Sequence, residues 1–350
     1  MKVNTLRSCW WKLLRHIARP YVGMGWAAIH TFAAVALAFG SASVSAQIDQ
    51  AAEPATEICI IIPHFKDEYW LSVGYGMRLE AEAQNAKLSI YESGGYHSLD
   101  RQISLLENCT ARKVDVILIG AVSADDPRLL SAVDSAASKV PVLALVNALN
   151  ASDLSGWIGV DWTDMGFEVG QFLTQRHPEG SAQKRVVLIS GPGVSGWGPL
   201  VEGGLNAGLD NSAIEIVATY RADTGLREQL REVESALADY PDVDYLIGSA
   251  PAIEGAMALL RRRNPDHTPK LIALYISHSV LRGLKSGQIE AVPFDDPIEQ
   301  GRLGIELAVK AANGETILGL TGPEIRLIET GTPQLADFHL SPAGFVPDPE

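Results

Sequence analysis

The sequence of 350 residues predicts an α/β protein of two doubly wound parallel-sheet lobes joined by a hinge. Short apolar runs alternate with segments of helical period, and the connections between them are short. This is the pattern of parallel strands covered by helices on both faces. The run from Ile58 to Ile62 is apolar throughout, as expected of a strand that is buried on both faces.

The alternation of elements continues through most of the chain. We expect strands at 58–62, 88–91, 116–119, 140–146, 185–190, 214–220, 245–248, 271–275 and 289–294. We expect helices at 69–84, 99–111, 127–137, 164–175, 200–209, 227–237, 253–263, 280–285 and 298–313. The first helix places Val73, Met77 and Ala81 on one face, and Asp164 is the expected N-cap of the fourth helix.

The rhythm restarts at 157–162, where we expect the second lobe to begin. The first lobe is therefore predicted to comprise 57–154 with 295–320, and the second lobe 155–294 with 321–350. The chain after Gly319 holds five prolines and only a short apolar run. We expect this tail to wrap the surface or cross the hinge, because it is too broken by proline to build a domain.

The first 46 residues have the composition of a secretory signal peptide. They combine five basic residues and no acidic one with an apolar stretch at 26–39 and a small-residue end, Val44-Ser45-Ala46. A membrane anchor is the alternative, but the apolar stretch is shorter than the ~20 residues that cross a bilayer. We therefore expect a signal peptide at 1–46, a linker at 47–56 and export of the mature chain.

The chain is acidic, with a formal net charge of −14, and the predicted signal peptide holds part of its positive charge. Such a balance disfavours a nucleic-acid partner, which requires a basic face. Cys9 lies in the predicted signal peptide, so two cysteines remain in the exported chain, Cys59 and Cys109. In an oxidising compartment they form either a disulfide or two buried thiols, and the sequence leaves both open.

Aromatic residues gather where ligands bind in this kind of fold. In open parallel sheets the binding site lies beyond the carboxyl ends of the strands. Large rings follow four predicted strand ends in a chain with only 7% aromatic residues: Tyr69, Trp70, Tyr96, Trp162 and Tyr275. Core packing is the alternative role for any single ring, but five rings at the predicted mouth favour a binding site.

A cage of rings suits two classes of ligand. Rings stack on the faces of sugars, or they surround a cation whose charge and methyl groups both favour the ring faces. The predicted mouth is poor in the polar side chains that sugar hydroxyls require. We therefore favour a small methylated cation, with Asp67 as the nearest polar partner.

No motif predicts catalysis, a cofactor or a metal site. The chain has no G-x-S-x-G nucleophile turn and no cysteine or histidine pair at metal-ligand spacing. The run Gly191 to Gly196 fits the G-x-G-x-x-G dinucleotide fingerprint, but Pro192 constrains its turn. Trp197-Gly198-Pro199 also delays the helix that should meet the phosphates, so we expect a mobile loop at the cleft.

Three motifs resemble the type I periplasmic binding proteins of the LacI/ribose-binding superfamily: Gly159-Val160-Asp161, Gly203-Gly204-Leu205 and Gln300-Gly301-Arg302-Leu303. A second set resembles, within that superfamily, the periplasmic sensors of trimethylamine N-oxide. It consists of Pro63-His64-x-Lys66-Asp67-x-Tyr69-Trp70-Leu71-Ser72-Val73, Gly94-Gly95-Tyr96, Gly159-Val160-Asp161-Trp162, Arg176-His177-Pro178 and Tyr275-x-Ser277-His278. The resemblance runs from about Cys59 to Asn313 and includes both remaining cysteines.

The resemblance implies a type I periplasmic binding protein that binds trimethylamine N-oxide. Such a protein presents the signal to the periplasmic domain of a membrane sensor histidine kinase, in two-component signal transduction. The residues it implies for the ligand cage are Tyr69, Trp70, Tyr96, Trp162 and Tyr275, with Asp67 beside them. Two alternatives stay open: a substrate-binding protein of an ABC transporter for a sugar or a quaternary amine, and an exported enzyme on the same fold.

Overall fold

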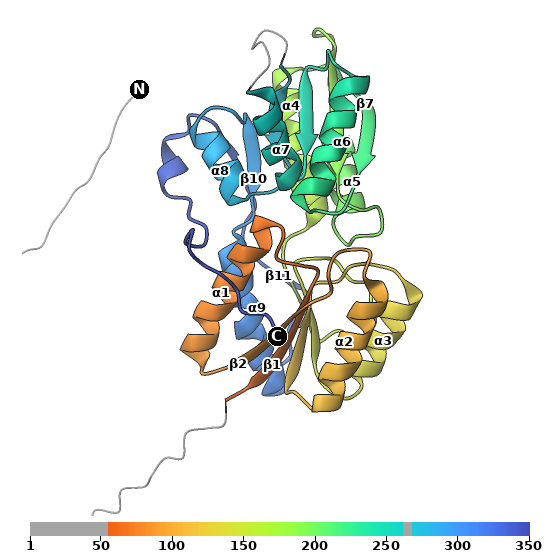
Figure 1. Cartoon of the computed structure of the whole chain (residues 1–350), viewed down its shortest axis with the longest axis vertical. Helices are drawn as coiled ribbons and strands as arrows, with labels where there is room; N and C mark the ends of the chain where they lie inside the picture. The colour runs from red at the N-terminus through yellow and green to blue at the C-terminus, as the bar shows by residue number, and fades with distance from the viewer. Residues whose placement is uncertain (1–54, 262–267) are drawn as a thin grey trace, which may run out of the picture. The chain divides into compact units, whose positions relative to one another are not determined.

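The structure is a computed structural model that describes residues 55–261 and 268–350 (Figure 1). The predicted signal peptide at 1–46 lies outside the described residues, as do all but the last two residues of the predicted linker. The end of the helix predicted at 253–263 lies outside them as well. Among the described residues, no helix combines the length and the apolar character that a membrane crossing requires.

The first sheet has the strand order β11-β5-β4-β3-β1-β2. Its strands are β1 (Glu57–Ile62), β2 (Lys87–Glu92), β3 (Val116–Ile119), β4 (Val142–Leu145), β5 (Gly156–Ile158) and β11 (Leu320–Thr321). Every pairing in this sheet is parallel.

The second sheet has the order β12-β10-β9-β8-β6-β7. Its strands are β6 (Lys184–Ser190), β7 (Ile214–Arg221), β8 (Tyr245–Gly248), β9 (Lys270–Ala273), β10 (Ala291–Phe294) and β12 (Arg326–Glu329). The strands pair in parallel, except that β12 runs antiparallel to β10 at one edge. Two parallel sheets in one chain confirm the predicted fold class.

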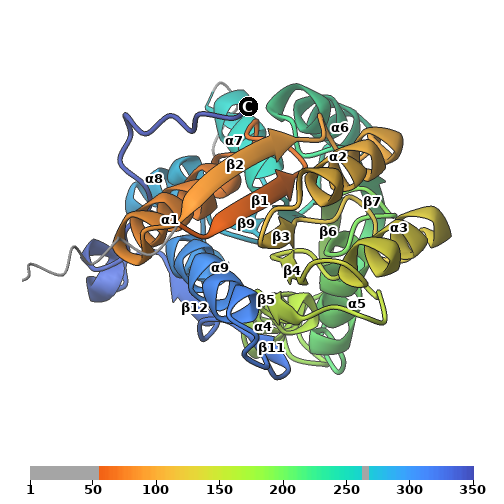
Figure 2. The same ribbon diagram turned by 90° about the horizontal axis from the view of Figure 1, so that it is seen from below.

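Helices connect the strands in both lobes. They are α1 (Glu68–Gln84), α2 (Leu99–Arg112), α3 (Pro127–Ala137), α4 (Trp162–Arg176), α5 (Gly198–Gly208), α6 (Leu226–Asp239), α7 (Ala250–Leu260), α8 (His278–Lys285) and α9 (Pro297–Ala312). Figures 1 and 2 show α1 and α9 on one side of the first sheet and α2 and α3 on the other.

This double cover explains why β1 is apolar from Ile58 to Ile62. Successive side chains of a strand point to opposite faces. Ile60 belongs to the core that contains Val73 and Met77 of α1, whereas the next residue, Ile61, belongs to the core that contains Leu106 of α2. A polar residue at either position would therefore lie in a core, so neither face of β1 admits one.

Glycines let two helix pairs approach closely, one pair in each lobe. A Cβ on Gly76 of α1 would lie 2.0 Å from the carbonyl oxygen of Ile298 on α9. A Cβ on Gly204 of α5 would lie 1.8 Å from the carbonyl oxygen of Thr163 on α4. No carbon atom tolerates such a distance, so any larger residue would push the two helices apart and displace the loops that they carry.

Two sequence-based expectations are wrong at the junction between the lobes. The strand at 156–158 pairs with β4 in the first sheet, so the chain enters the second lobe after Ile158 rather than at 155. The helix that follows begins at Trp162 and is capped by Asp161, whose Oδ1 accepts a hydrogen bond from the Thr163 N–H at 2.8 Å. Asp164 is not the cap because it already lies within the first turn.

The tail after α9 crosses between the lobes, as the sequence predicts, but the assignment of 321–350 to the second lobe is wrong at both ends, because Thr321 pairs with Ile158 in the first sheet and Glu350 contacts β2. β11 adds to the first sheet beside β5, and β12 adds to the second sheet beside β10. The chain then returns to the first lobe, where the Glu350 N–H donates to the carbonyl oxygen of Ile90 on the edge strand β2, at 2.8 Å. The tail therefore joins existing sheet edges and builds no domain of its own.

A disulfide joins Cys59 of β1 to Cys109 of α2, across a separation of 50 residues. Both cysteines are buried in the core between the first sheet and its α2–α3 layer. The bond thus attaches a covering helix to β1, the strand between β3 and the edge strand β2.

We expect the peptides that contain Cys59 and Cys109 to be joined in an unreduced tryptic digest, as measured by mass spectrometry. The double substitution Cys59→Ala with Cys109→Ala should lower the free energy of unfolding by ~2–4 kcal/mol, because a closed loop no longer restricts the unfolded chain. Alkylation of both thiols in the denatured, unreduced protein would contradict the bond.

Candidate ligand-binding site

A small cavity with about 220 Å³ of empty space lies where the strand ends of the two sheets meet. Its lining residues all follow the carboxyl ends of parallel strands, which is where open α/β sheets bind ligands. They are Asp67, Tyr69, Trp70, Tyr96, Val146, Asn147, Trp162, Trp197, Thr224 and Tyr275. The space between these side chains is narrow, so only a small molecule could occupy it.

All six residues predicted for the site from sequence line this cavity: Asp67, Tyr69, Trp70, Tyr96, Trp162 and Tyr275. Each is at most 4% exposed. Trp162 follows β5 of the first sheet, not a strand of the second sheet as predicted. The first sheet therefore supplies four of the five predicted rings, and Tyr275, which follows β9, comes from the second.

Tyr275 stands nearly perpendicular to the neighbouring rings around the cavity. Tyr275 is 5.5 Å from Tyr69 and 6.0 Å from Trp162 between ring centroids, at interplanar angles of 81° and 87°. Tyr69 and Trp162 are 6.4 Å apart. Perpendicular rings present faces to a common space, and a cation within ~6 Å of a ring centroid is attracted by that face.

Sequence reasoning missed one ring, Trp197. It is 5.5 Å from Trp162 and 5.4 Å from Tyr275 between centroids, and it is 2% exposed. The glycine-rich run before it makes room for it, because a Cβ on Gly191 would lie 2.1 Å from its Cζ2 atom. The signal was in the sequence, since this tryptophan also follows a strand end. We call Tyr69, Trp70, Tyr96, Trp162, Trp197 and Tyr275 the ring cage.

The loop at 191–196 lies at the cleft, as predicted. Hydrogen bonds join its residues to one another and join the loop to the first lobe across the cleft. Ser195 Oγ donates to the carbonyl oxygen of Pro192 at 2.7 Å and accepts from the Gly198 N–H at 3.0 Å. The Gly196 carbonyl oxygen accepts from the N–H of Ala148, in the first lobe, at 3.1 Å. The loop thereby places Trp197 against the rings of Trp162 and Tyr275.

Val146 supports the site from a strained backbone. Its φ of 66° is a left-handed conformation that β-branched residues rarely adopt. Its carbonyl oxygen accepts from Trp162 Nε1 at 3.0 Å, and its N–H donates to the carbonyl oxygen of Ile158 at 2.6 Å. Such strain persists where the surroundings enforce it, and here it orients the indole and the next residue, Asn147.

Asp67 is the one acidic residue among those that line the cavity, and none of them is lysine or arginine. Its Oδ1 accepts from the Tyr69 N–H at 3.0 Å, and its Oδ2 accepts from the Tyr275 hydroxyl at 2.6 Å. Burial raises its pKa to about 6, although these hydrogen bonds oppose the shift. At neutral pH the carboxylate is therefore mainly ionised, and the site has a negative potential that favours a cation.

The Tyr96 hydroxyl is placed to donate to a ligand. It accepts a hydrogen bond from Asn147 Nδ2 at 3.1 Å, and burial raises its pKa above its usual value, so it keeps its proton. A hydroxyl has one proton and two lone pairs. With a lone pair used by Asn147, its proton is free to reach an acceptor in the cavity.

A second buried carboxylate lies behind the cage. The Tyr69 hydroxyl donates to Asp295 Oδ2 at 2.7 Å, and Gln300 Nε2 donates to the same oxygen at 2.8 Å. Burial raises the pKa of Asp295 to about 6, against the effect of both hydrogen bonds. Asp295 follows β10, where the chain returns to the first lobe, so it fixes one cage ring to the crossing between the lobes.

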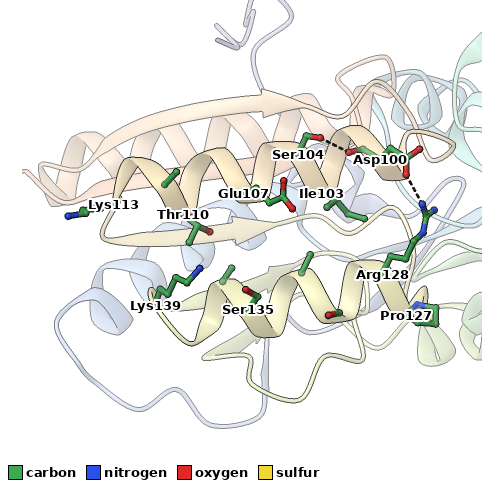
Figure 3. A pocket seen from close by; sticks show the side chains of 14 residues that line it. Asp100, Ile103, Ser104, Glu107, Thr110, Lys113, Pro127, Arg128, Ser135 and Lys139 are labelled. Carbon is green, nitrogen blue, oxygen red and sulfur yellow. Dashed lines mark hydrogen bonds and ion pairs between the residues drawn. The ribbon is translucent and has the colours of Figure 1, made fainter.

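A larger groove on the described surface lies between α2 and α3 (Figure 3). Its lining includes Asp100 and Arg128, which form an ion pair at 2.8 Å, and Lys113 and Lys139 at the other end. No aromatic residue lines it. This groove is larger than the cavity between the sheets, but it lacks the rings that converge there with a carboxylate and a hydroxyl. We therefore choose the candidate site by its chemistry and not by its volume.

Residues 58–316 match the family model described as the periplasmic binding protein domain. The periplasmic protein TorT of Escherichia coli (strain K12) is 32% identical over 311 residues, which cover 87% of this chain and 87% of that protein. The chain is a periplasmic binding protein of the TorT family. Membership confirms the family and the periplasmic location that the sequence motifs predict.

Solved structures of the family and of transport proteins are similar to this chain. TorT in its complex with the TorS sensor domain in the presence of TMAO has a TM-score of 0.74 at 34% identity, covering 84% of this chain and 99% of that one. An ABC transporter solute-binding protein from Bradyrhizobium sp. BTAi1 with bound Bis-Tris has a TM-score of 0.70 at 33% identity, covering 85% and 89%. Both confirm the type I binding-protein fold for this TorT-family chain.

We expect Asp295→Asn to change how stability depends on pH. The folded pKa of about 6 exceeds the ordinary value of 3.8, so the folded state holds the proton more tightly. The wild-type protein should therefore lose up to about 3 kcal/mol of unfolding free energy from this group as the pH rises through that interval. The variant stays neutral and should lack this loss. The difference in unfolding free energy between the variant and the wild type should therefore shift in favour of the variant as the pH rises.

Urea unfolding at several pH values from about 4 to 7 measures the effect. Asp210→Asn is the control, because Asp210 is exposed on the surface. Parallel curves of stability against pH for the wild type and Asp295→Asn would show that Asp295 titrates normally.

Proposed function

We propose that this protein binds trimethylamine N-oxide in the ring cage and presents the bound state to the periplasmic domain of a TorS-like membrane histidine kinase. The observation that carries the proposal is the convergence of six rings, one carboxylate and one available hydroxyl in a cavity for a small molecule. The similarity to TorT in the TorS complex supports the choice of ligand and of partner.

The chemistry of the ligand suits each part of the cavity. Trimethylamine N-oxide has a positive nitrogen with three methyl groups and a negative oxygen. The methyl groups and the charge favour the ring faces, and the carboxylate of Asp67 adds Coulomb attraction for the nitrogen. The oxygen requires a donor, and the Tyr96 hydroxyl offers one, whereas Asp67 is ionised and only accepts.

The same arrangement supports binding without turnover. The hydroxyls of Tyr69 and Tyr275 donate to buried carboxylates, and burial raises the pKa of each well above its usual value. These groups are poor nucleophiles and poor bases, because a general base works best with a pKa near the operating pH. The hydroxyls of Tyr69 and Tyr275 therefore hold the rings in place and are not activated for attack on a ligand, in agreement with a sensor.

A second candidate function is delivery of a ligand to an ABC transporter. The similarity to the Bradyrhizobium solute-binding protein, at 33% identity, favours it. The ring faces and Asp67 suit a quaternary amine as well as an N-oxide, so the two functions differ mainly in the partner. Calorimetric titration with the N-oxide, in the presence and absence of the kinase sensor domain, distinguishes them.

In that titration we expect saturable binding of trimethylamine N-oxide and none of ribose. We also expect the sensor domain to change the affinity, because ligand and partner are linked through the closed lobes. Thermal unfolding gives an independent measure, since ligand at 100 times its Kd adds ~2.7 kcal/mol. Tighter binding of a pentose than of the N-oxide would overturn the proposal, and an affinity unchanged by the sensor domain would favour transport.

We expect Trp162→Ala to weaken N-oxide binding by roughly three- to thirtyfold, because a buried cation–π contact contributes ~1–2 kcal/mol. Trp157→Ala is the matched control: Trp157 is half-buried in the neighbouring strand β5 and does not line the cavity. It should lower stability and leave the affinity of the folded protein unchanged. Equal affinity in Trp162→Ala and the wild type would remove Trp162 from the cage.

We expect Tyr96→Phe to weaken N-oxide binding about tenfold, because a hydrogen bond to a charged oxygen contributes ~1.5 kcal/mol or more. The ring stays in place, so binding of tetramethylammonium, which has no oxygen, should be nearly unchanged. Calorimetry with both ligands separates the two contributions. An equal loss for both would show that Tyr96 acts through its ring or through the fold.

A further inference from the structure

Two residues outside the ligand cavity join the lobes directly. His64 follows β1 in the first lobe, and its Nε2 lies 3.1 Å from Oδ1 of Asp223, which follows β7 in the second lobe. The other oxygen of Asp223, Oδ2, accepts from the Tyr96 N–H at 3.0 Å. The imidazole of His64 is 1% exposed and the Asp223 side chain 15%, so the contact is well shielded from water.

We propose that His64 and Asp223 form a latch that stabilises the closed lobes and thereby sets the ligand affinity without contacting the ligand. Neither residue lines the cavity. The proposal rests on the ligand-binding function proposed above, because it concerns the affinity of that same site.

The Asp223 carboxylate is built into this position. Its Oδ1 also accepts from the Thr224 N–H at 2.7 Å, and Gln229 Nε2 holds the loop through the carbonyl oxygen of Ala222 at 2.9 Å. Burial raises its pKa, but the hydrogen bond and charge of His64 and the two backbone N–H donors outweigh burial, and the pKa lies below its usual value. The carboxylate is therefore ionised at neutral pH and bound by donors from both lobes.

The first lobe makes room for this carboxylate. A Cβ on Gly95 would lie 2.4 Å from Asp223 Oδ2, so only glycine at this position lets the carboxylate reach the Tyr96 N–H. The neighbouring Gly94 offers a natural comparison. It also has a positive φ, 102° against 137° for Gly95, but its Cβ would meet only Ser98 Oγ, at 3.4 Å.

The latch influences the ligand site by two routes. It adds contacts that exist only when the lobes are closed, and so it increases the closed population. If only the closed form binds the ligand, the apparent affinity is the intrinsic affinity multiplied by the closed fraction. It also fixes the backbone of Tyr96, whose hydroxyl is the proposed donor to the ligand. Loss of the latch should therefore increase the open population and lower the affinity together.

The test measures lobe separation and affinity in the same set of variants. Spin labels at Glu107→Cys on α2 and Glu234→Cys on α6, both exposed, report the distance between the lobes by pulsed electron paramagnetic resonance. Asp223→Asn removes the negative charge of the carboxylate. Gly95→Ala leaves this charge in place but pushes the carboxylate away from the Tyr96 N–H. Asp210→Asn and Gly94→Ala are the matched controls.

Without ligand, we expect a larger open population in Asp223→Asn and Gly95→Ala than in the wild type and the controls. The N-oxide affinity of the two latch variants should fall by roughly three- to tenfold, which is about the effect of losing one hydrogen bond of average strength. Distance distributions that are the same in all variants would overturn the latch even if the N-oxide binds as proposed. The two proposals can also fail separately. If the open population rises only in the latch variants but the wild type does not bind the N-oxide, the latch is supported and the proposed function is overturned.

Discussion

The buried carboxylate of Asp67 is the group on which most of the site depends. One oxygen caps the start of α1 and so fixes where Tyr69 and Trp70 begin their helix. The other accepts from Tyr275 of the second lobe, so the same carboxylate helps to hold the lobes together. Its ionised form supplies the negative charge of the cavity. Helix initiation and contact between the lobes are thus combined with the ligand selection that we propose in a single residue.

The geometry around Asp67 follows from a constraint of parallel sheets. All parallel strands of a sheet end at the same edge, and two sheets that share a cleft bring two such edges together. The glycine contacts of α1 with α9 and of α4 with α5 bring the helix backbones close together. Because α1 and α4 also carry Trp70 and Trp162, the packing of the helices determines where the rings stand.

The fold was predictable from the sequence because its signals are local. The continuous apolar run of β1 and the helical periods between strands indicate which residues are buried, and each pattern can be recognised within a single segment. The boundary at β5 was not predictable, since a three-residue strand carries too little pattern to show which sheet it joins. Pairing with β4 is a long-range choice, decided by the register of the two strands.

The candidate site was predictable to a similar degree and for a similar reason. Rings directly after strand ends are visible in the sequence, and all five that were selected line the cavity. Trp197 was hidden behind a glycine-rich loop that resembles a nucleotide motif. Asn147 was hidden because its position depends on the left-handed backbone of Val146, a conformation that nothing in the residue type suggests. Asp223 required the pairing of two lobes, which no local pattern contains.

In the proposed function, the burial of Asp67 makes the cavity distinguish ligands by charge. Burial costs free energy for the ionised carboxylate and raises its pKa to about 6. A neutral ligand leaves the cost in place, whereas a positive nitrogen offsets it by Coulomb attraction in a medium of low dielectric constant. The closed state is therefore favoured most by a ligand with positive charge beside Asp67. A partner that recognises the closed lobes must then bind more tightly when that ligand is present, and the ligand more tightly when the partner is, because the coupling between two sites is reciprocal.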